Sequence, residues 1–258
     1  MPPRPGVPAA RSALALLQAL ARQPGAVPAA ALARELGLPR STTYHLLAEL
    51  VAAGFAVHLP EERRYGLGVS AFEIGSAYAR QEPLARLARP VLARLVDAVR
   101  HSAHLAVPHG REVLYVVEQR APGRPPLVTD VGVRLPAHLT ASGRALLADL
   151  PPAQVRALFP DPAAFVDRHG SGPRRLSELR RLLGEVRRAG HACEDGEVTP
   201  GFASVAAAVH DHTGRPTAAV AVTFPSDEDE PDRTELALRV RRAAAELTRR
   251  INGRPPRS

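Results

Sequence analysis

Residues 31–45 constrain the fold more than any other segment of this chain. They are typical of the end of one helix, a turn at Gly37, and the beginning of a second helix. Ala33 is small enough to let the second helix pack closely, and Gly37 has the conformational freedom that a tight turn requires. The second helix begins with polar side chains, and its apolar side consists of Leu46, Leu47 and Leu50. This pattern predicts a helix-turn-helix.

The neighbouring residues predict the rest of a three-helix unit. A first helix is expected over residues 11–22 and a short second helix over residues 28–36. The third helix runs from Ser41, its expected N-cap, to about Ala53, and Gly54 ends it. The apolar side of the first helix consists of Leu14, Leu17 and Leu20.

A β-hairpin is expected next, from strands over residues 55–59 and 63–67 joined by a polar turn. Three helices followed by a hairpin predict a winged helix-turn-helix, whose third helix enters the major groove of DNA. Hydroxyl groups can donate to phosphates or base edges, and arginine can neutralise a phosphate or read guanine. Taken singly, each such residue could equally be a helix cap or part of a solvated turn. The predicted DNA contacts are Arg40, Ser41, Thr42, Thr43, Tyr44, His45, Arg63 and Arg64.

Composition limits the partners and the compartment. The net charge of +8 favours an acidic partner, either a nucleic acid or an anionic membrane surface. The apolar stretches are too short to span a bilayer, and residues 1–6 lack the apolar core of a signal peptide. With Cys193 as the single cysteine, no intrachain disulfide can form. We therefore expect a cytoplasmic protein that does not associate with membranes.

The second half of the chain predicts an α+β domain, because helices flank a mixed set of strands. Helices are expected over residues 84–99, 142–149, 152–159, 177–189 and 232–251, and strands over 104–108, 113–119, 127–131, 204–211 and 217–224. The acidic run 227–232 is expected to be a solvated loop. The expected organisation is a disordered tail (1–8), a DNA-binding domain (9–68), a linker helix (69–82), a sensor domain (83–252) and a second disordered tail (253–258).

Residues 11–67 resemble the DNA-binding domain of the IclR family of bacterial transcriptional regulators. The matching motifs are Arg-Ser-Ala-Leu-Ala-Leu-Leu from Arg11, Leu-Ala-Arg-Glu-Leu-Gly-Leu from Leu32, Pro-Arg-Ser-Thr-Thr-Tyr-His-Leu-Leu from Pro39, Leu-Val-Ala-Ala-Gly-Phe from Leu50, and Tyr-Gly-Leu-Gly from Tyr65. The family commonly has arginine where this chain has His45, so an operator preference does not carry over. The resemblance continues to about Ile251 and implies a GAF-like mixed α/β effector-binding domain.

The same resemblance implies an effector site in that domain. The segment from Pro136 opens a helix whose free backbone N–H groups can hold a carboxylate. In the family, effectors are held by an acidic residue, a small polar residue and hydroxyl groups from the later segments. Alternation along a strand places Ala221 and Thr223 on one face, although Ala221 lacks a hydroxyl. By position, the implied residues are Ala141, Ser142, Glu194 or its neighbour Asp195, Ser204, Ala221 and Thr223.

The expected function is a transcriptional repressor that binds a double-stranded DNA operator as a homodimer or homotetramer. A carboxylate or an aromatic acid is the expected effector, and no cofactor, metal site or catalytic residue is expected. The ten histidines show no compact set at zinc spacing, and no base is identified for Cys193. One alternative is a sensor domain with enzymatic or metal-dependent activity tethered to DNA. Another is a basic protein that binds nucleic acid without sequence preference.

Overall fold

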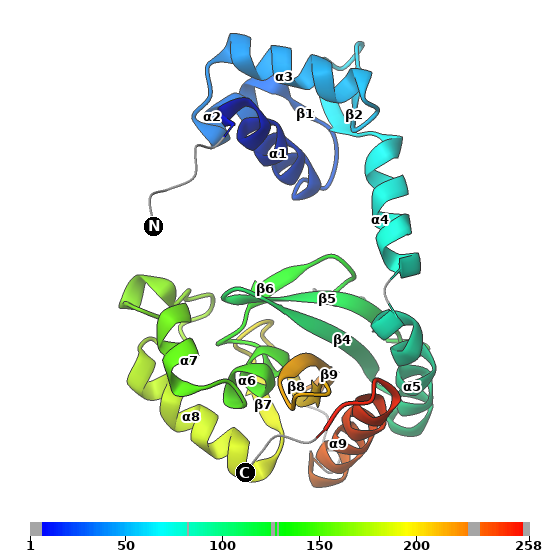
Figure 1. Cartoon of the computed structure of the whole chain (residues 1–258), viewed down its shortest axis with the longest axis vertical. Coiled ribbons are helices and arrows are strands. Elements are labelled where there is room, and N and C mark those ends of the chain that lie inside the picture. The colour runs from blue at the N-terminus through cyan, green and yellow to red at the C-terminus, as the bar shows by residue number, and fades with distance from the viewer. Residues whose placement is uncertain (1–6, 82, 125–126, 128, 227–232, 255–258) are drawn as a thin grey trace. The chain divides into compact units, whose positions relative to one another are not determined.

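The structure is a computed structural model that describes residues 7–81, 83–124, 127, 129–226 and 233–254. Its contacts divide the chain into two compact units, Met1–Glu82 and Pro83–Ser258, coloured from blue to cyan and from green to red in Figure 1. Most of the two tails and the acidic run 227–232 lie outside the described residues. No helix of the described part is long and apolar enough to cross a membrane.

The N-terminal unit is a winged helix-turn-helix, as the sequence predicts. Its helices are α1 (Pro8–Ala21), α2 (Ala29–Leu36) and α3 (Arg40–Ala52), and α4 (Val69–Gln81) follows the hairpin. Its strands are β1 (Val27–Pro28), β2 (Ala56–Leu59) and β3 (Arg64–Leu67). They form an antiparallel sheet in the order β1-β3-β2, in which the two-residue strand β1 is an addition to the predicted elements.

The turn between α2 and α3 has the geometry that its sequence predicts. Gly37 has a φ of 64°, and the N–H of Leu38 donates to the carbonyl of Ala33 at 2.9 Å. This is a Schellman cap, in which glycine adopts the left-handed conformation after the last helical turn. The prediction of Ser41 as an N-cap is wrong, because α3 begins one residue earlier, at Arg40, directly after the extended Pro39.

The core of this unit corrects the predicted apolar side of the first helix. Leu16, Ala19 and Leu20 of α1 are buried, whereas Leu14 is 61% exposed. Because α1 is rich in leucine and alanine, its sequence is compatible with more than one apolar face. Packing against buried residues of α2 and α3 selects the face that is used, and these include Leu32, Leu47 and Leu50.

The C-terminal unit is built on one six-stranded antiparallel sheet with the order β6-β5-β4-β9-β8-β7. Its strands are β4 (Ser102–His109), β5 (Glu112–Gln119), β6 (Arg134–Pro136), β7 (Ala192–Asp195), β8 (Phe202–His210) and β9 (Pro216–Pro225). Its helices are α5 (Pro83–Val99), α6 (Ala141–Ala148), α7 (Pro152–Leu158), α8 (Leu176–Ala189) and α9 (Arg233–Arg250), with a 3-10 turn at Pro162–Ala164.

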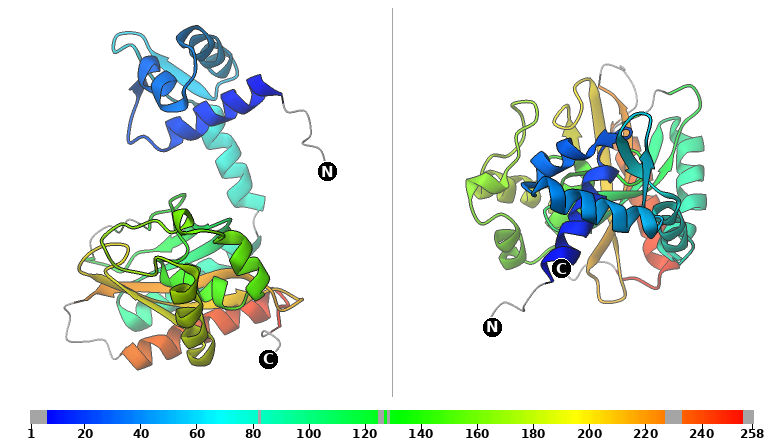
Figure 2. Two further views of the ribbon diagram at one scale, coloured as in Figure 1. Left: turned by 90° about the vertical axis from the view of Figure 1, so that its left-hand side faces the viewer. Right: turned by 90° about the horizontal axis from the view of Figure 1, so that it is seen from above.

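Helices cover both faces of this sheet (Figure 2). The helices α5 and α9 pack together on one face, over a core that includes Leu92, Val220 and Leu247. On the other face α6 lies on β8 and β9 and contacts α8, around a second core that includes Phe159 and Leu179. The fold is therefore an α+β sandwich in which α6 is placed directly against the central strands.

The strand predicted over residues 127–131 is absent from the described part of that segment. The Asp130 carboxylate accepts from the N–H of Val131 at 2.7 Å, and Gly132 follows with a φ of 89°. A side chain that bonds to its own backbone favours a turn over a sheet ladder. The short strand β6 follows this turn and pairs with β5 instead.

Candidate functional site

The N-terminal half of α3 exposes most of the polar residues that the sequence selects. Arg40, Ser41, Thr42, Tyr44 and His45 are all exposed. The opposite side of the helix is buried in the core of the unit through Leu47 and Leu50. This division is what a helix needs if it is to be anchored in its domain while it presents polar side chains to a partner.

Thr43 does not belong to that exposed surface. Its side chain is fully buried, and its hydroxyl donates to the carbonyl of Pro39 at 3.0 Å. The predicted DNA contact at Thr43 is therefore wrong. Its hydroxyl adds a second hydrogen bond to the Pro39 carbonyl, which also accepts from the Thr43 N–H at 3.0 Å in the first turn of α3.

The hairpin places its two arginines at the beginning of β3. Arg63 has a φ of 53°, in the left-handed region, and both arginines are exposed. The guanidinium of Arg64 donates to the carbonyl of Ala26 at 3.0 Å, so part of its hydrogen-bonding capacity is used within the unit. The rings of His58 and Tyr65 stack across the two strands at 4.5 Å between centroids. This stack stiffens the hairpin that carries Arg63.

Arg34, a cationic residue near the turn, is not among the DNA contacts predicted from the sequence. Arg34 and Arg40 line the same surface hollow, of about 640 Å³, beside Gly37. The N-terminal unit contains eight arginines against six glutamates, so most of the net charge of +8 resides in the other unit. Attraction of an anion by this unit must therefore depend on where these arginines lie more than on its net charge.

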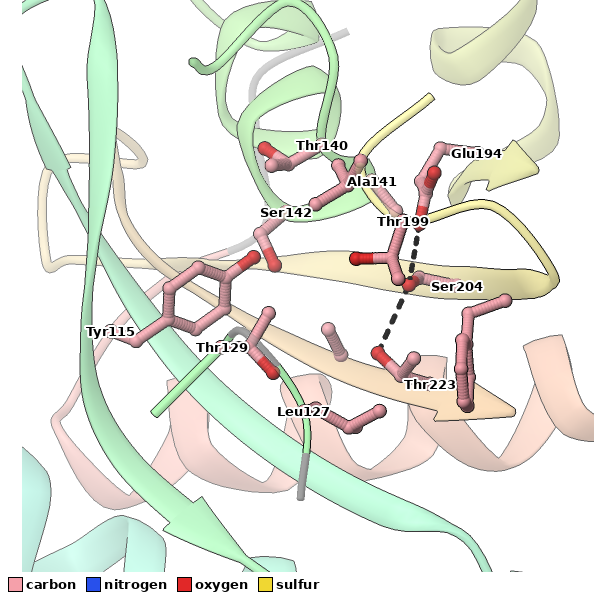
Figure 3. A pocket seen from close by; sticks show the side chains of 13 residues that line it. Tyr115, Leu127, Thr129, Thr140, Ala141, Ser142, Glu194, Thr199, Ser204 and Thr223 are labelled. Atoms are coloured by element: carbon pink, nitrogen blue, oxygen red, sulfur yellow. Dashed lines mark hydrogen bonds between the residues drawn. The ribbon is translucent and has the colours of Figure 1, made fainter. Parts of the chain in front are cut away.

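The C-terminal unit contains a cavity between α6 and the sheet, with a lining of mixed apolar and polar side chains (Figure 3). Six of the residues that line it are those implied by the resemblance, and they come from α6, β7, β8 and β9. These six are Ala141, Ser142, Glu194, Ser204, Ala221 and Thr223. The cavity volume is about 20 Å³, which is room for about one water molecule.

Three of these polar side chains form a row across neighbouring strands. Glu194 pairs in register with Ser204, and Ser204 pairs with Thr223. The Ser204 hydroxyl donates to Glu194 Oε1 at 2.7 Å and lies 3.0 Å from the Thr223 hydroxyl (Figure 3). A serine hydroxyl has one proton, and Ser204 uses it in the hydrogen bond to Glu194. The Thr223 hydroxyl is therefore the donor in its hydrogen bond with Ser204.

Glu194 is the acidic residue of this cavity. It is 5% exposed; its Oε2 atom makes no hydrogen bond of good geometry among the described residues, and the backbone N–H of Val198 lies close enough to the carboxylate to lower its pKa. Loss of solvent raises the pKa of Glu194 to about 7, and the nearby charge of Glu197 acts in the same direction. The alternative, Asp195, points elsewhere: its exposed carboxylate accepts from Ser226 and Arg233.

The first turn of α6 forms the opposite wall. Thr140 is the N-cap, and its hydroxyl accepts from the N–H of Gly143 at 3.0 Å. The N–H groups of Ala141 and Ser142 precede that bond and have no intrahelical partner. The buried Ser142 Oγ makes no hydrogen bond of good geometry among the described residues, and the Tyr115 hydroxyl is the side-chain group that approaches it. This wall can therefore donate hydrogen bonds to an anion, and the Glu194 wall can accept them.

Arg144 joins these two walls. It is 2% exposed, and it donates to the carbonyls of His138 and Cys193 at 2.9 and 2.8 Å. It also pairs with Glu197 at 2.8 Å. The Cys193 carbonyl belongs to the residue directly before Glu194. The Arg144 guanidinium thus holds β7 against α6, a role that the sequence alone does not reveal.

The cavity also has lining residues that the sequence did not predict, among them Tyr115 of β5 and Thr129 in the turn before β6. Tyr115 points toward Ser142, and burial raises the pKa of its hydroxyl well above the usual range (Figure 3). Thr129 lies 2.8 Å from His104 Nε2, and burial lowers the pKa of that histidine to about 4. His104 is therefore neutral at physiological pH. The alternation of residues 113–119 is the one sequence signal that could have placed Tyr115 inward.

The other reactive groups do not join this cavity. Cys193 is exposed and lies between inward-facing residues of β7. His210 bonds to Asp149 at 2.8 Å. Within the described residues, no three His, Cys, Asp or Glu side chains are placed to hold a metal ion.

The two units together define a class of protein: a transcription regulator with a winged helix and a cavity-bearing α/β domain. Residues 9–60 match the IclR helix-turn-helix domain, and residues 76–249 match the C-terminal domain of the bacterial transcriptional regulator IclR. The chain belongs to the IclR family of bacterial transcriptional regulators.

Individual relatives agree with this placement. The HTH-type transcriptional repressor AllR of Klebsiella pneumoniae is 28% identical over 235 residues, which cover 88% of this chain and 84% of AllR. An IclR transcriptional regulator from Silicibacter sp. TM1040 superposes with a TM-score of 0.83 at 26% identity, covering 96% of this chain and 98% of that one. An IclR homologue from Microbacterium hydrocarbonoxydans, solved with 4-hydroxybenzoate, has the same fold, with a TM-score of 0.79, 23% identity and coverage of 94% and 98%.

Proposed function

We propose that this chain is a cytoplasmic repressor that binds an operator through α3 and the hairpin, and releases it when a small organic acid occupies the Glu194 cavity. In this proposal residues 9–68 bind DNA, residues 69–82 link the units, and residues 83–252 bind the acid. The observation that carries it is the convergence of six side chains from four separate elements on one cavity of the C-terminal unit. Family membership supports the DNA-binding role.

The ligand that this cavity suits has two different ends. A carboxylate can accept from the N–H groups at the start of α6, where the helix dipole favours negative charge. The opposite end faces Glu194, whose Oε2 makes no hydrogen bond of good geometry among the described residues. That end should therefore carry a hydrogen-bond donor such as a hydroxyl. The 4-hydroxybenzoate bound by the Microbacterium homologue has this two-ended chemistry.

The small size of the cavity supports a link between ligand binding and conformational change. A ring-sized acid cannot enter a cavity of about 20 Å³ unless the lining residues move apart. A ligand that binds one arrangement of the lining better than another shifts the population toward it. Such coupling is typically about 1–3 kcal/mol, or roughly 5- to 150-fold in operator affinity.

The first test is at the DNA surface. A duplex is selected from a random-sequence pool with the full-length protein, and its affinity is measured by fluorescence anisotropy at fixed salt. Because Arg40 and Thr42 are exposed at the start of α3, the double variant Arg40→Ala/Thr42→Ala is expected to bind at least about 100-fold more weakly. Arg11→Ala, which removes an exposed charge from α1, should bind within about threefold of wild type. Equal affinity of the wild-type protein for selected and random duplexes would contradict sequence-specific regulation.

The second test is at the cavity. Benzoate, 4-hydroxybenzoate and 4-methoxybenzoate are compared by titration calorimetry and by release of the selected duplex. At pH 8, where Glu194 is ionised, the ligand hydroxyl can donate to Oε2, so 4-hydroxybenzoate is expected to bind about tenfold more tightly than benzoate. The methoxy compound has no donor and should bind most weakly. If benzoate binds as well as 4-hydroxybenzoate, Glu194 does not select the ligand.

The proposed repressor acts as a homodimer whose contact includes α4. Val69 and Phe72 lie three residues apart on α4, on one face, and are 66% and 75% exposed. An exposed apolar face of this kind typically marks an interface. Phe72→Asp is expected to shift the protein to monomers in sedimentation velocity and to weaken binding to a palindromic duplex. If the Phe72→Asp dimer is as stable as the wild-type dimer, the dimer contact does not include this face of α4. Dimer and tetramer contacts then involve other surfaces.

A further inference from the structure

A second concavity lies between α9 and β8, and it shares no lining residue with the Glu194 cavity. Its volume is about 570 Å³, within the range that small-molecule sites usually have. Apolar side chains of the two elements form much of its lining: Ala207, Ala208, Leu238, Ala244 and Ala245. We call this concavity the α9 groove.

Three arginines of α9 give the groove a positive charge. Arg241, Arg242 and Arg249 line it, and none of its described lining residues is acidic. The other three arginines of α9 are in ion pairs, Arg233 with Asp195, Arg239 with Glu235 and Arg250 with Glu246. For the three that line the groove, no described residue provides a carboxylate within ion-pair distance. The arginines without internal counter-charges on this helix are thus the ones gathered around the groove.

Two further lining residues, His210 and Gly190, bring no free anion to the groove. The imidazole of His210 is bonded to Asp149 at 2.8 Å. Gly190 ends α8 beside the Arg241 guanidinium, and a Cβ added there would lie 3.3 Å from Arg241 Nε. The absent side chain leaves this guanidinium accessible.

The spacing of the arginines suggests the length of a ligand. Arg242 and Arg249 are seven residues apart and share a helix face, so their Cα atoms lie about 10 Å apart along the axis. Guanidinium groups bind carboxylates through paired hydrogen bonds, and alanine-rich surface suits an apolar or aromatic body. We propose that the α9 groove binds a small organic dianion. Its apolar body lies over the alanines, and its two acidic groups bind at opposite ends of the body, one near Arg242 and one near Arg249. This ligand is separate from the acid of the Glu194 cavity.

The experiment uses the full-length protein and titration calorimetry with biphenyl-4,4′-dicarboxylate. The expected result is saturable binding with one site per chain, about tenfold tighter than biphenyl-4-carboxylate and than inorganic phosphate. Arg242→Ala/Arg249→Ala should weaken it by at least about tenfold. The matched control Arg239→Ala/Arg250→Ala removes two arginines of the same helix that are paired elsewhere, and it should leave the affinity within about twofold.

Three outcomes would overturn the proposal: no saturable binding, equal weakening in the two double variants, or phosphate binding as tight as that of the dicarboxylate. Glu194→Gln separates this site from the other cavity. Dicarboxylate binding that persists in Glu194→Gln supports the α9 groove whatever becomes of 4-hydroxybenzoate. Binding that disappears in Glu194→Gln assigns the dicarboxylate to the Glu194 cavity and refutes the groove.

Discussion

Replacement of Arg144 with Met is expected to cost about 3–5 kcal/mol of unfolding free energy, because it leaves a carboxylate unpaired in a nearly buried ion pair. Arg144 is 2% exposed and makes three contacts, with the His138 carbonyl, the Cys193 carbonyl and Glu197. Methionine fills a similar volume but donates no hydrogen bond, so both carbonyls also lose a partner. Urea unfolding followed by circular dichroism measures the change.

The exposed pair between Arg250 and Glu246 provides the control, and Arg250→Met should cost less than about 1 kcal/mol. The structural role of Arg144 also predicts a second readout. Because its guanidinium holds the residue before Glu194, Arg144→Lys should fold but bind 4-hydroxybenzoate more weakly than wild type. Lysine keeps one charge but cannot reach three acceptors in a plane. Equal unfolding free energies of Arg144→Met and wild type would show that this contact set does not stabilise the domain.

Glu194→Gln is expected to stabilise the protein at pH 8 and to have little effect near pH 4.5. The folded-state pKa of Glu194 is raised to about 7 from an ordinary value of 4.5. Between these two values the unfolded chain has already lost the proton that the folded chain keeps. The unfolding free energy of wild type therefore falls as the pH rises from about 4.5 to 7, by up to about 3 kcal/mol, and then levels off.

Glutamine cannot ionise, and its carbonyl still accepts from Ser204, so the variant should lack this decline. Chemical denaturation of both proteins from pH 4.5 to 8.5 measures the difference. Glu185→Gln, at an exposed position of α8, controls for the removal of one negative charge. Parallel pH profiles for wild type and Glu194→Gln would mean that Glu194 is not the group whose burial penalises ionisation.

Local sequence was enough to predict the winged helix-turn-helix. Gly37 has the left-handed conformation because few other residues tolerate it, and this preference belongs to the residue itself. The alternation of Ala221 and Thr223 toward one cavity likewise follows from strand geometry. The burial of Thr43 could not be predicted in this way, because it depends on how α3 packs within the N-terminal unit.

The helix-turn-helix of residues 31–45 was therefore determined by the sequence itself, through short-range preferences for turns, caps and periodic apolar faces. The cavity was decided only by the tertiary structure. Strand register brings Glu194, Ser204 and Thr223 into one row although 29 residues separate the first from the last. Loss of solvent then shifts the pKa of Glu194, and Arg144 gains acceptors from Cys193 and Glu197, 49 and 53 residues further along the chain. Register and desolvation are properties of the packed chain, which is why no local pattern contains them.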